Sequence, residues 1–166
     1  MTRRPGRKYV FLLLACLLAG NAGAGSSGDL GYRPAADPFH TLKAAQSAAR
    51  AKHKKILVIA GGAWCRWCHV LDRFLSGNED VRAELHKEFE IVKVYVGEEN
   101  DNAAFFSTLP RAAGYPHLWV LSGDGRVLAS VDTGRLEKGR DGNDKAAFLA
   151  AIRKGSGQSA RLKPSR

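Results

Sequence analysis

The sequence feature that most constrains the fold is a cysteine pair, Cys65 and Cys68, placed between two apolar segments of different periodicity. Residues 56–60 are apolar throughout and rich in β-branched side chains, which predicts a strand buried on both faces. Two glycines follow, and residues 65–76 then carry apolar side chains at helical spacing. The cysteines therefore lie where a buried strand passes into the first turn of a helix.

This position favours redox chemistry at the first cysteine. The free N–H groups and the positive end of the helix dipole stabilise a thiolate, so we expect Cys65 to ionise readily, with Arg66 adding positive charge nearby. Cys68 lies one turn further on, close enough to attack a mixed disulfide formed by Cys65. The pair is thus predicted to cycle between dithiol and disulfide.

The surrounding residues predict one α/β domain over residues 38–154. Asp37 and Pro38 are typical of a helix start, and that helix is expected to end near Lys54. A helix that starts after Asn78 has an apolar stripe whose last member is Phe89. A second strand over residues 91–96 follows it. A short helix over residues 102–108, a hairpin of residues 117–121 and 126–131, a charged loop and a last helix follow. A mixed sheet of about four strands flanked by helices is expected, with its first two strands parallel.

The N-terminus is typical of an export signal. Residues 1–24 contain a basic start, an 11-residue apolar run and an Ala22-Gly23-Ala24 site, the layout of a cleaved signal peptide. The run is shorter than the roughly 20 residues that a membrane-spanning helix needs. Leu13-Leu14-Ala15-Cys16 leaves lipidation at Cys16 open. We expect a periplasmic or secreted protein, with a linker over residues 25–37 and a basic, disordered tail over residues 155–166.

Composition excludes several classes of protein. A chain of 166 residues that is 45% hydrophobic and 25% charged is neither a polytopic membrane protein nor wholly disordered. The net charge of +10 includes four basic residues of the signal segment, and no aromatic interleaving or base-reading motif indicates nucleic-acid binding. Membrane contact is expected only through a lipid or an uncleaved signal.

A disulfide between residues only three apart stabilises the fold little. The two cysteines of the mature chain, Cys65 and Cys68, are therefore expected to serve a chemical role.

On these motifs the chain resembles the thioredoxin superfamily, and most closely its exported bacterial members, which include periplasmic disulfide reductase domains. The resemblance implies a thioredoxin-like fold and a thiol–disulfide oxidoreductase without metal or other cofactor. It would act on exported protein substrates and draw electrons from a dithiol partner. Cys65 would attack and Cys68 would resolve, with Tyr115 bordering the site and Pro116 in a cis bond that faces the cysteines. The matching parts are residues 56–60, Trp64-Cys65-Arg66-Trp67-Cys68, Gly114-Tyr115-Pro116, Gly123-Asp124-Gly125 and the last helix.

One position departs from this resemblance. Many members of the superfamily carry a buried acid six residues before the first cysteine, and here that residue is Ile59. Asp72, on the same helix face as Cys68, is proposed as an assisting acid or base, although an exposed helix carboxylate is the more common occurrence. Trp64 is expected to pack at the edge of the site. Trp67, between the cysteines, is expected to expose an apolar surface to partner chains.

Other functions remain open at this point. Cys65-x-x-Cys68-His69 is also the attachment motif of c-type haem, in which His69 would ligate the iron. Zinc would need a second clustered ligand pair, which the sequence does not offer. The same fold could also serve as a non-catalytic module whose cysteines stay paired while it binds partners. The sequence does not decide between a reductase and an oxidase, and the resemblance favours a reductase.

Overall fold

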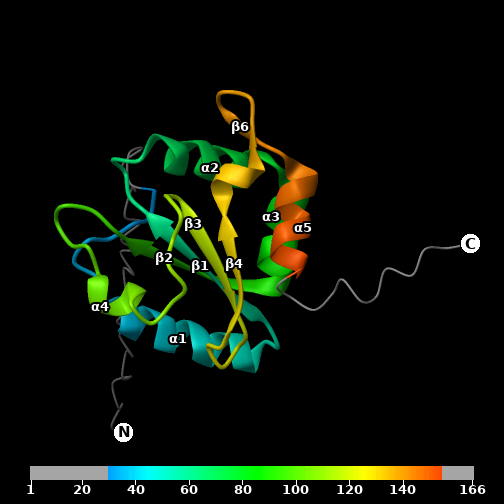
Figure 1. Cartoon of the computed structure of the whole chain (residues 1–166). Helices are drawn as coiled ribbons and strands as arrows, with labels where there is room; N and C mark the ends of the chain where they lie inside the picture. The colour runs from blue at the N-terminus through cyan, green and yellow to red at the C-terminus, as the bar shows by residue number, and fades with distance from the viewer. Residues whose placement is uncertain (1–29, 155–166) are drawn as a thin grey trace, which may run out of the picture.

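The computed structural model describes residues 30–154, in which a mixed sheet lies between two layers of helices (Figure 1). The predicted signal peptide, Cys16 and the basic tail lie outside these residues. The helices are α1 (Pro38–Ala51), α2 (Arg66–Gly77), α3 (Glu79–Glu88), α4 (Ala103–Phe106) and α5 (Lys145–Lys154). The strands are β1 (Lys55–Gly61), β2 (Phe89–Tyr95), β3 (His117–Leu121), β4 (Val127–Asp132), β5 (Glu137–Lys138) and β6 (Gly142–Asn143).

Within the described residues, four strands form one sheet in the order β2-β1-β3-β4. β1 and β2 are parallel, which requires the crossover through α2 and α3, and β3 pairs antiparallel with both β1 and β4. The predicted mixed sheet of about four strands is therefore confirmed. The hairpin between β3 and β4 turns at residues 122–125, where Gly125 has a φ of +95° that favours glycine.

β1 is buried on both faces, as its apolar sequence predicts. Leu57 and Ile59 contribute to the core under α2, α3 and α5. The residues that alternate with them, Ile56, Val58 and Ala60, contribute to the core under α1 and α4. In Figure 1 the two layers lie on opposite sides of the sheet, with α2 at the top and α1 at the bottom. Packing on both faces fixes β1, and three residues separate its end from Cys65.

Two helix ends differ from the sequence prediction. α1 begins as expected, with the Asp37 carboxylate accepting a hydrogen bond from the Phe39 N–H at 2.9 Å. It ends at Ala51 rather than near Lys54, because His53 has a φ of 54°, a left-handed backbone conformation that does not continue an α-helix. α3 ends at Glu88, and Phe89 starts β2 in register with Lys55 of β1 instead of ending the helix.

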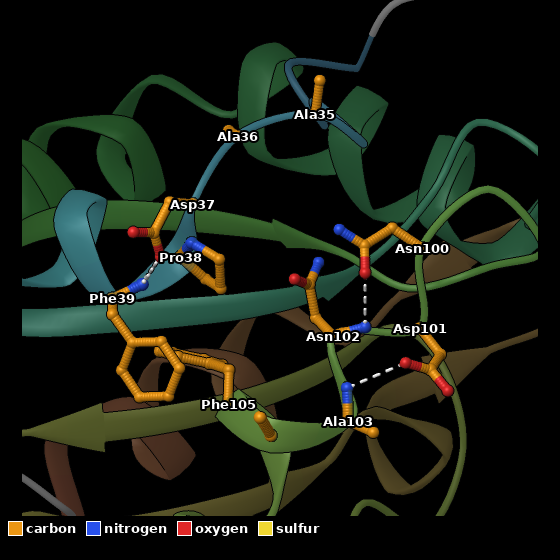
Figure 2. A pocket seen from close by; sticks show the side chains of 11 residues that line it. Ala35, Ala36, Asp37, Pro38, Phe39, Asn100, Asp101, Asn102, Ala103 and Phe105 are labelled. Atoms are coloured by element: carbon orange, nitrogen blue, oxygen red, sulfur yellow. Dashed lines mark hydrogen bonds between the residues drawn. The ribbon is translucent and has the colours of Figure 1, made fainter.

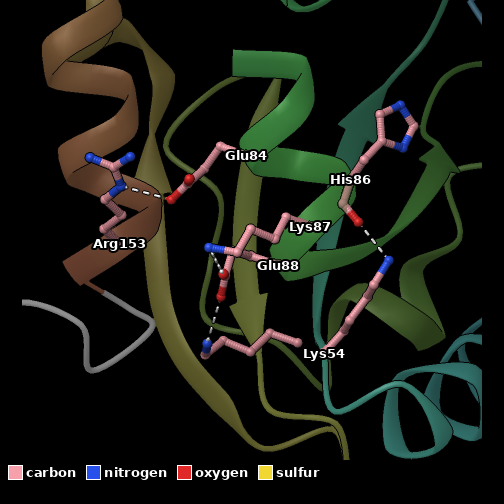
Figure 3. A network of polar contacts seen from close by, with 7 residues as sticks. Lys54, Glu84, His86, Lys87, Glu88 and Arg153 are labelled. Atoms are coloured by element: carbon pink, nitrogen blue, oxygen red, sulfur yellow. Dashed lines mark hydrogen bonds and ion pairs between the residues drawn. The ribbon is translucent and has the colours of Figure 1, made fainter. Parts of the chain in front are cut away.

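A network of polar contacts ties α3 to its neighbours (Figure 3). Arg153 of α5 donates to Glu84 of α3 over 2.8 Å, and Lys54, before β1, donates to the His86 carbonyl over 2.5 Å. Lys87 and Lys55 lie 3.5 and 3.8 Å from the carboxylate of Glu88. Arg153, Lys54 and Lys55 thus connect α3 to α5 and to the start of β1.

The segment expected to be one charged loop after β4 contains short ordered elements. Thr133–Leu136 forms a 3₁₀ turn, in which the Asp132 carboxylate accepts from the Gly134 N–H at 3.0 Å. β5 and β6 then form a two-residue hairpin. Such short strands give no period-2 pattern, so the sequence did not predict them. β6 contacts α2, and Asp141, in the loop between β5 and β6, binds Arg66 in the first turn of α2.

Candidate active site

The cysteine pair lies at the junction of β1 and α2. Cys65 is the N-cap of α2 in an extended conformation, and its Sγ accepts a hydrogen bond from the Cys68 backbone N–H at 3.3 Å. The first N–H groups of a helix have no acceptor within the helix, and the helix dipole is positive at this end. This geometry directs a backbone N–H and the positive end of the helix dipole at the Cys65 sulfur and places the second cysteine next to it.

The two sulfurs have different surroundings, although both cysteines are free thiols. Cys65 is 6% exposed and Cys68 only 2%. Burial, followed by the hydrogen bond with Cys65, raises the pKa of Cys68 to about 12, while hydrogen bonds from the Gly62 backbone and Tyr32 act in the opposite direction. Cys68 is therefore a protonated thiol near neutral pH, and its thiolate must be formed before it can act as a nucleophile.

The Tyr115–Pro116 peptide faces Cys65 from the loop before β3. The bond is cis, as the resemblance implies, and the Cys65 thiol donates to the Tyr115 carbonyl with a sulfur–oxygen distance of 3.4 Å. The Thr133 hydroxyl donates to the Pro116 carbonyl from beyond β4. The backbone next to the proline is thus fixed within contact distance of Cys65.

The two tryptophans of the motif have different environments. Trp64 is 58% exposed, and it is oriented by a 2.7 Å hydrogen bond from its Nε1 to the Val96 carbonyl and by an edge-on contact with Tyr115. Trp67 is half-buried and packs against the core under α2. Trp64, and not Trp67, therefore presents the larger apolar surface beside Cys65.

Arg66, between the cysteines, is held by the β5–β6 hairpin. Its Nη2 lies 2.5 Å from the Asp141 carboxylate and 3.2 Å from the Arg140 carbonyl. Both charged side chains are mostly exposed, so the pair adds little stability. The contact shows that the loop between β5 and β6 lies next to the first turn of α2.

Asp72 does not contact either sulfur directly. Its Oδ1 accepts a hydrogen bond from Lys93 Nζ of β2 at 2.8 Å, and its side chain is 38% exposed. Lys93 also donates to the Leu30 carbonyl and lies over the ring of Tyr32, 5.5 Å from its centroid. The carboxylate is thus joined to the cysteine pair through Lys93 and Tyr32.

Tyr32 is the residue near the cysteines that the sequence analysis missed. It lies within the segment expected to be a linker, residues 25–37, yet its side chain is only 7% exposed and belongs to the core under α2. Leu30 packs against the same core. The available signal was a leucine and a tyrosine in a segment otherwise dominated by Gly, Ser and Ala.

His69, the residue that would ligate the iron in a c-type haem protein, is hydrogen-bonded to the loop before α2. Its Nε2 lies 2.7 Å from the Ala63 carbonyl, a hydrogen bond that closes the loop before α2.

Within residues 30–154, no group of three or more His, Cys, Asp or Glu side chains is arranged to hold a metal ion. Also within this range, no helix has the length and apolar character needed to cross a bilayer.

A surface pocket lies between the segment before α1 and the loop before α4 (Figure 2). Its polar side chains cap local turns: Asp37 bonds the Phe39 N–H, Asn100 the Asn102 N–H, and Asp101 the Ala103 N–H. None of the candidate site residues lines it. These polar groups are satisfied by the fold, and the pocket is not part of the cysteine site.

Comparisons with known proteins agree with this geometry. A family model described as thioredoxin-like matches residues 37–123. The structure is similar to a disulphide isomerase from Xylella fastidiosa Temecula1, with 32% identity, a TM-score of 0.55, and coverage of 60% of this chain and 76% of that one. It also shares its fold with the DsbH oxidoreductase (18% identity, TM-score 0.52, 67% and 78% covered). A thioredoxin from Thermus thermophilus is similar in fold (18% identity, TM-score 0.50, 70% and 84% covered). No curated protein matches the chain.

Proposed function

The chain belongs to the thioredoxin-like family, and we propose that it is a thiol–disulfide oxidoreductase in which Cys65 and Cys68 exchange electrons with protein disulfides. The observation that carries the proposal is the position of Cys65 Sγ. It lies at the N-terminus of α2, 3.3 Å from the Cys68 N–H donor and 3.4 Å from the Tyr115 carbonyl. The second sulfur follows one helical turn later.

The reaction takes two exchange steps. The Cys65 thiolate attacks one sulfur of a substrate disulfide, which forms a mixed disulfide and releases the other substrate sulfur as a thiolate. Cys68 then loses its proton and attacks the Cys65 sulfur, which releases the second substrate thiolate. The Cys65–Cys68 pair is oxidised by two electrons, the substrate is reduced by two, and the proton from Cys68 balances one taken up by the product. A dithiol partner returns the pair to the reduced state.

The order of the two cysteines follows from their surroundings. Burial raises the pKa of Cys68 to about 12, so at neutral pH this sulfur is a poor initial nucleophile. Cys65 is the less buried of the two and accepts a backbone hydrogen bond at the helix start. Cys65 is therefore assigned the attack on substrate, and Cys68 the resolution of the mixed disulfide.

Protein substrates are supported by the surface around Cys65. Trp64 is a large exposed apolar side chain, and its contact with Tyr115 joins it to the backbone at Pro116. An extended chain carrying a disulfide can pack on Trp64 while its backbone lies beside Tyr115 and Pro116. Trp67 contributes mainly by packing beneath this surface.

The proposal places the protein outside the cytoplasm, in the periplasm or secreted, on the basis of the signal-like residues 1–24. Disulfides persist in such compartments, so an exported dithiol must be kept reduced by another dithiol protein. The reductive direction is proposed on the resemblance to periplasmic disulfide reductase domains. No metal or nucleotide takes part in the steps above.

A reduction potential combined with a turnover assay tests this function against that of a non-catalytic binding module. We expect the protein to accelerate reduction of insulin by dithiothreitol, and its cysteine pair to have a potential of roughly −120 to −270 mV, the range of exchange-active dithiols. The potential is measured by equilibrating the protein in glutathione buffers and counting thiols by mass. A potential below about −300 mV without any acceleration would identify an inert bridge instead.

A further inference from the structure

The hydroxyl of Tyr32 lies near the sulfur of Cys68, next to Gly61 at the end of β1. Gly61 allows this approach, because a Cβ at that position would lie 2.4 Å from Cys68 Sγ and 2.9 Å from the Tyr32 hydroxyl oxygen. The two groups thus share the space left by the missing side chain, and Tyr32 and Cys68 are hydrogen-bond partners. The contact joins two residues 36 positions apart, from the segment before α1 and from α2.

Tyr32 acts as the donor in this contact. Burial, the two cysteines and Asp72 all raise the pKa of Tyr32, so the phenol remains protonated across the working pH range. Its hydrogen bond lowers the pKa of Cys68, against the effect of burial. A phenol O–H directed at sulfur stabilises the thiolate more than the thiol, since hydrogen bonds to charged acceptors are the stronger ones.

We propose that Tyr32 is a catalytic residue that donates a hydrogen bond to Cys68 Sγ while this sulfur carries negative charge, an inference that rests on the proposed function. In the resolving step, Cys68 becomes a thiolate, its sulfur bonds to the Cys65 sulfur, and the substrate thiolate leaves. In the reverse step, a partner thiolate attacks Cys65, the Cys65–Cys68 bond breaks, and Cys68 departs as the thiolate. In both directions Tyr32 keeps its proton, and Cys68 exchanges its own with solvent or with the departing sulfur.

Lys93 and Asp72 are positioning residues for Tyr32. The Lys93 ammonium binds the Leu30 carbonyl and the Asp72 carboxylate, and it lies over the Tyr32 ring. These contacts tie the segment of Leu30 and Tyr32 to β2 and α2. The titratable groups that face Tyr32 are therefore the two cysteines, Asp72 and Lys93.

The test uses dithiobisnitrobenzoate, a disulfide reagent that reports on the two sulfurs separately. Attack by Cys65 forms an adduct and releases one coloured thiolate. Attack by Cys68 on that adduct then releases a second coloured thiolate. In Tyr32→Phe, which keeps the ring, we expect the first release to be unchanged and the second to be slower by about fivefold to tenfold. The deficit should shrink as the pH rises and Cys68 ionises without help. Tyr95→Phe is the matched control, because Tyr95 is also 7% exposed but its hydroxyl bonds Glu99, and neither release should change.

Lys93→Met provides a second variant that retains the hydroxyl. We expect it to slow the second release by a smaller factor, because Tyr32 is less firmly held. An unchanged second release in both variants would overturn the proposal. So would equal slowing of both releases together with a lower denaturation midpoint, which would show a purely structural role. The reagent reports on the sulfurs without a protein substrate, so this result is independent of whether insulin is reduced.

Discussion

Replacing Cys65 by serine is expected to lower insulin reduction to the rate of dithiothreitol alone. A serine hydroxyl is not ionised at neutral pH and forms no mixed disulfide, so the first exchange step is lost. The fold should be preserved, because serine is a favoured N-cap and its Oγ can accept the Cys68 N–H that the sulfur accepts now. The measurement is the turbidity of the released insulin chains with and without the variant.

A denaturation midpoint close to that of the wild type is the control for this loss of activity. If the variant is folded and still reduces insulin at the wild-type rate, Cys65 is not the nucleophile. Because Cys68 is buried and protonated near neutral pH, it is not expected to replace Cys65.

Replacing Cys68 by serine is expected to stop the reaction after its first step. Cys65 still attacks the substrate disulfide, but no second thiol can displace the adduct, so a mixed disulfide with the substrate accumulates. Incubation with a disulfide-bonded protein followed by intact-mass analysis under non-reducing conditions should show one substrate chain per protein. Excess dithiothreitol should release it. Turnover with insulin should fall to near the uncatalysed rate.

The matched control is the variant in which both cysteines are serine, which should trap nothing. Accumulation of adduct in Cys65→Ser, and its absence in Cys68→Ser, would reverse the assigned roles. The same trapped adducts identify physiological partners when the Cys68→Ser protein is expressed in cells.

The parts of the fold that follow from local signals were predictable. The apolar run of β1, the glycine turn after β3 and the Asp37–Pro38 start of α1 each depend on a few neighbouring residues, and the structure contains all three. The cysteine pair was equally visible, because its chemistry needs only a strand before it and a helix after it. The fold class and the central residues of the site therefore follow from the sequence.

Contacts between distant segments were not predictable in the same way. Tyr32 reaches Cys68 only because the chain before α1 folds back over β1, where Gly61 leaves space. Helical spacing places Asp72 on the same face as Cys68, but spacing alone does not show that Lys93 binds its carboxylate. The environments of Trp64 and Trp67 depend on how the first turn of α2 packs on the core, which the motif does not specify.

The central claim is that Cys65 is the reactive sulfur and Cys68 its buried, protonated partner. The most direct test is to treat the reduced wild-type protein with limiting iodoacetamide at neutral pH, quench, unfold, and locate the label by peptide mass spectrometry. The account predicts label on Cys65 while Cys68 stays unmodified, with Cys68 labelled only after unfolding or at a pH well above neutral, in line with its pKa of about 12. Labelling of Cys68 first, or of both cysteines at the rate of the unfolded chain, would contradict it.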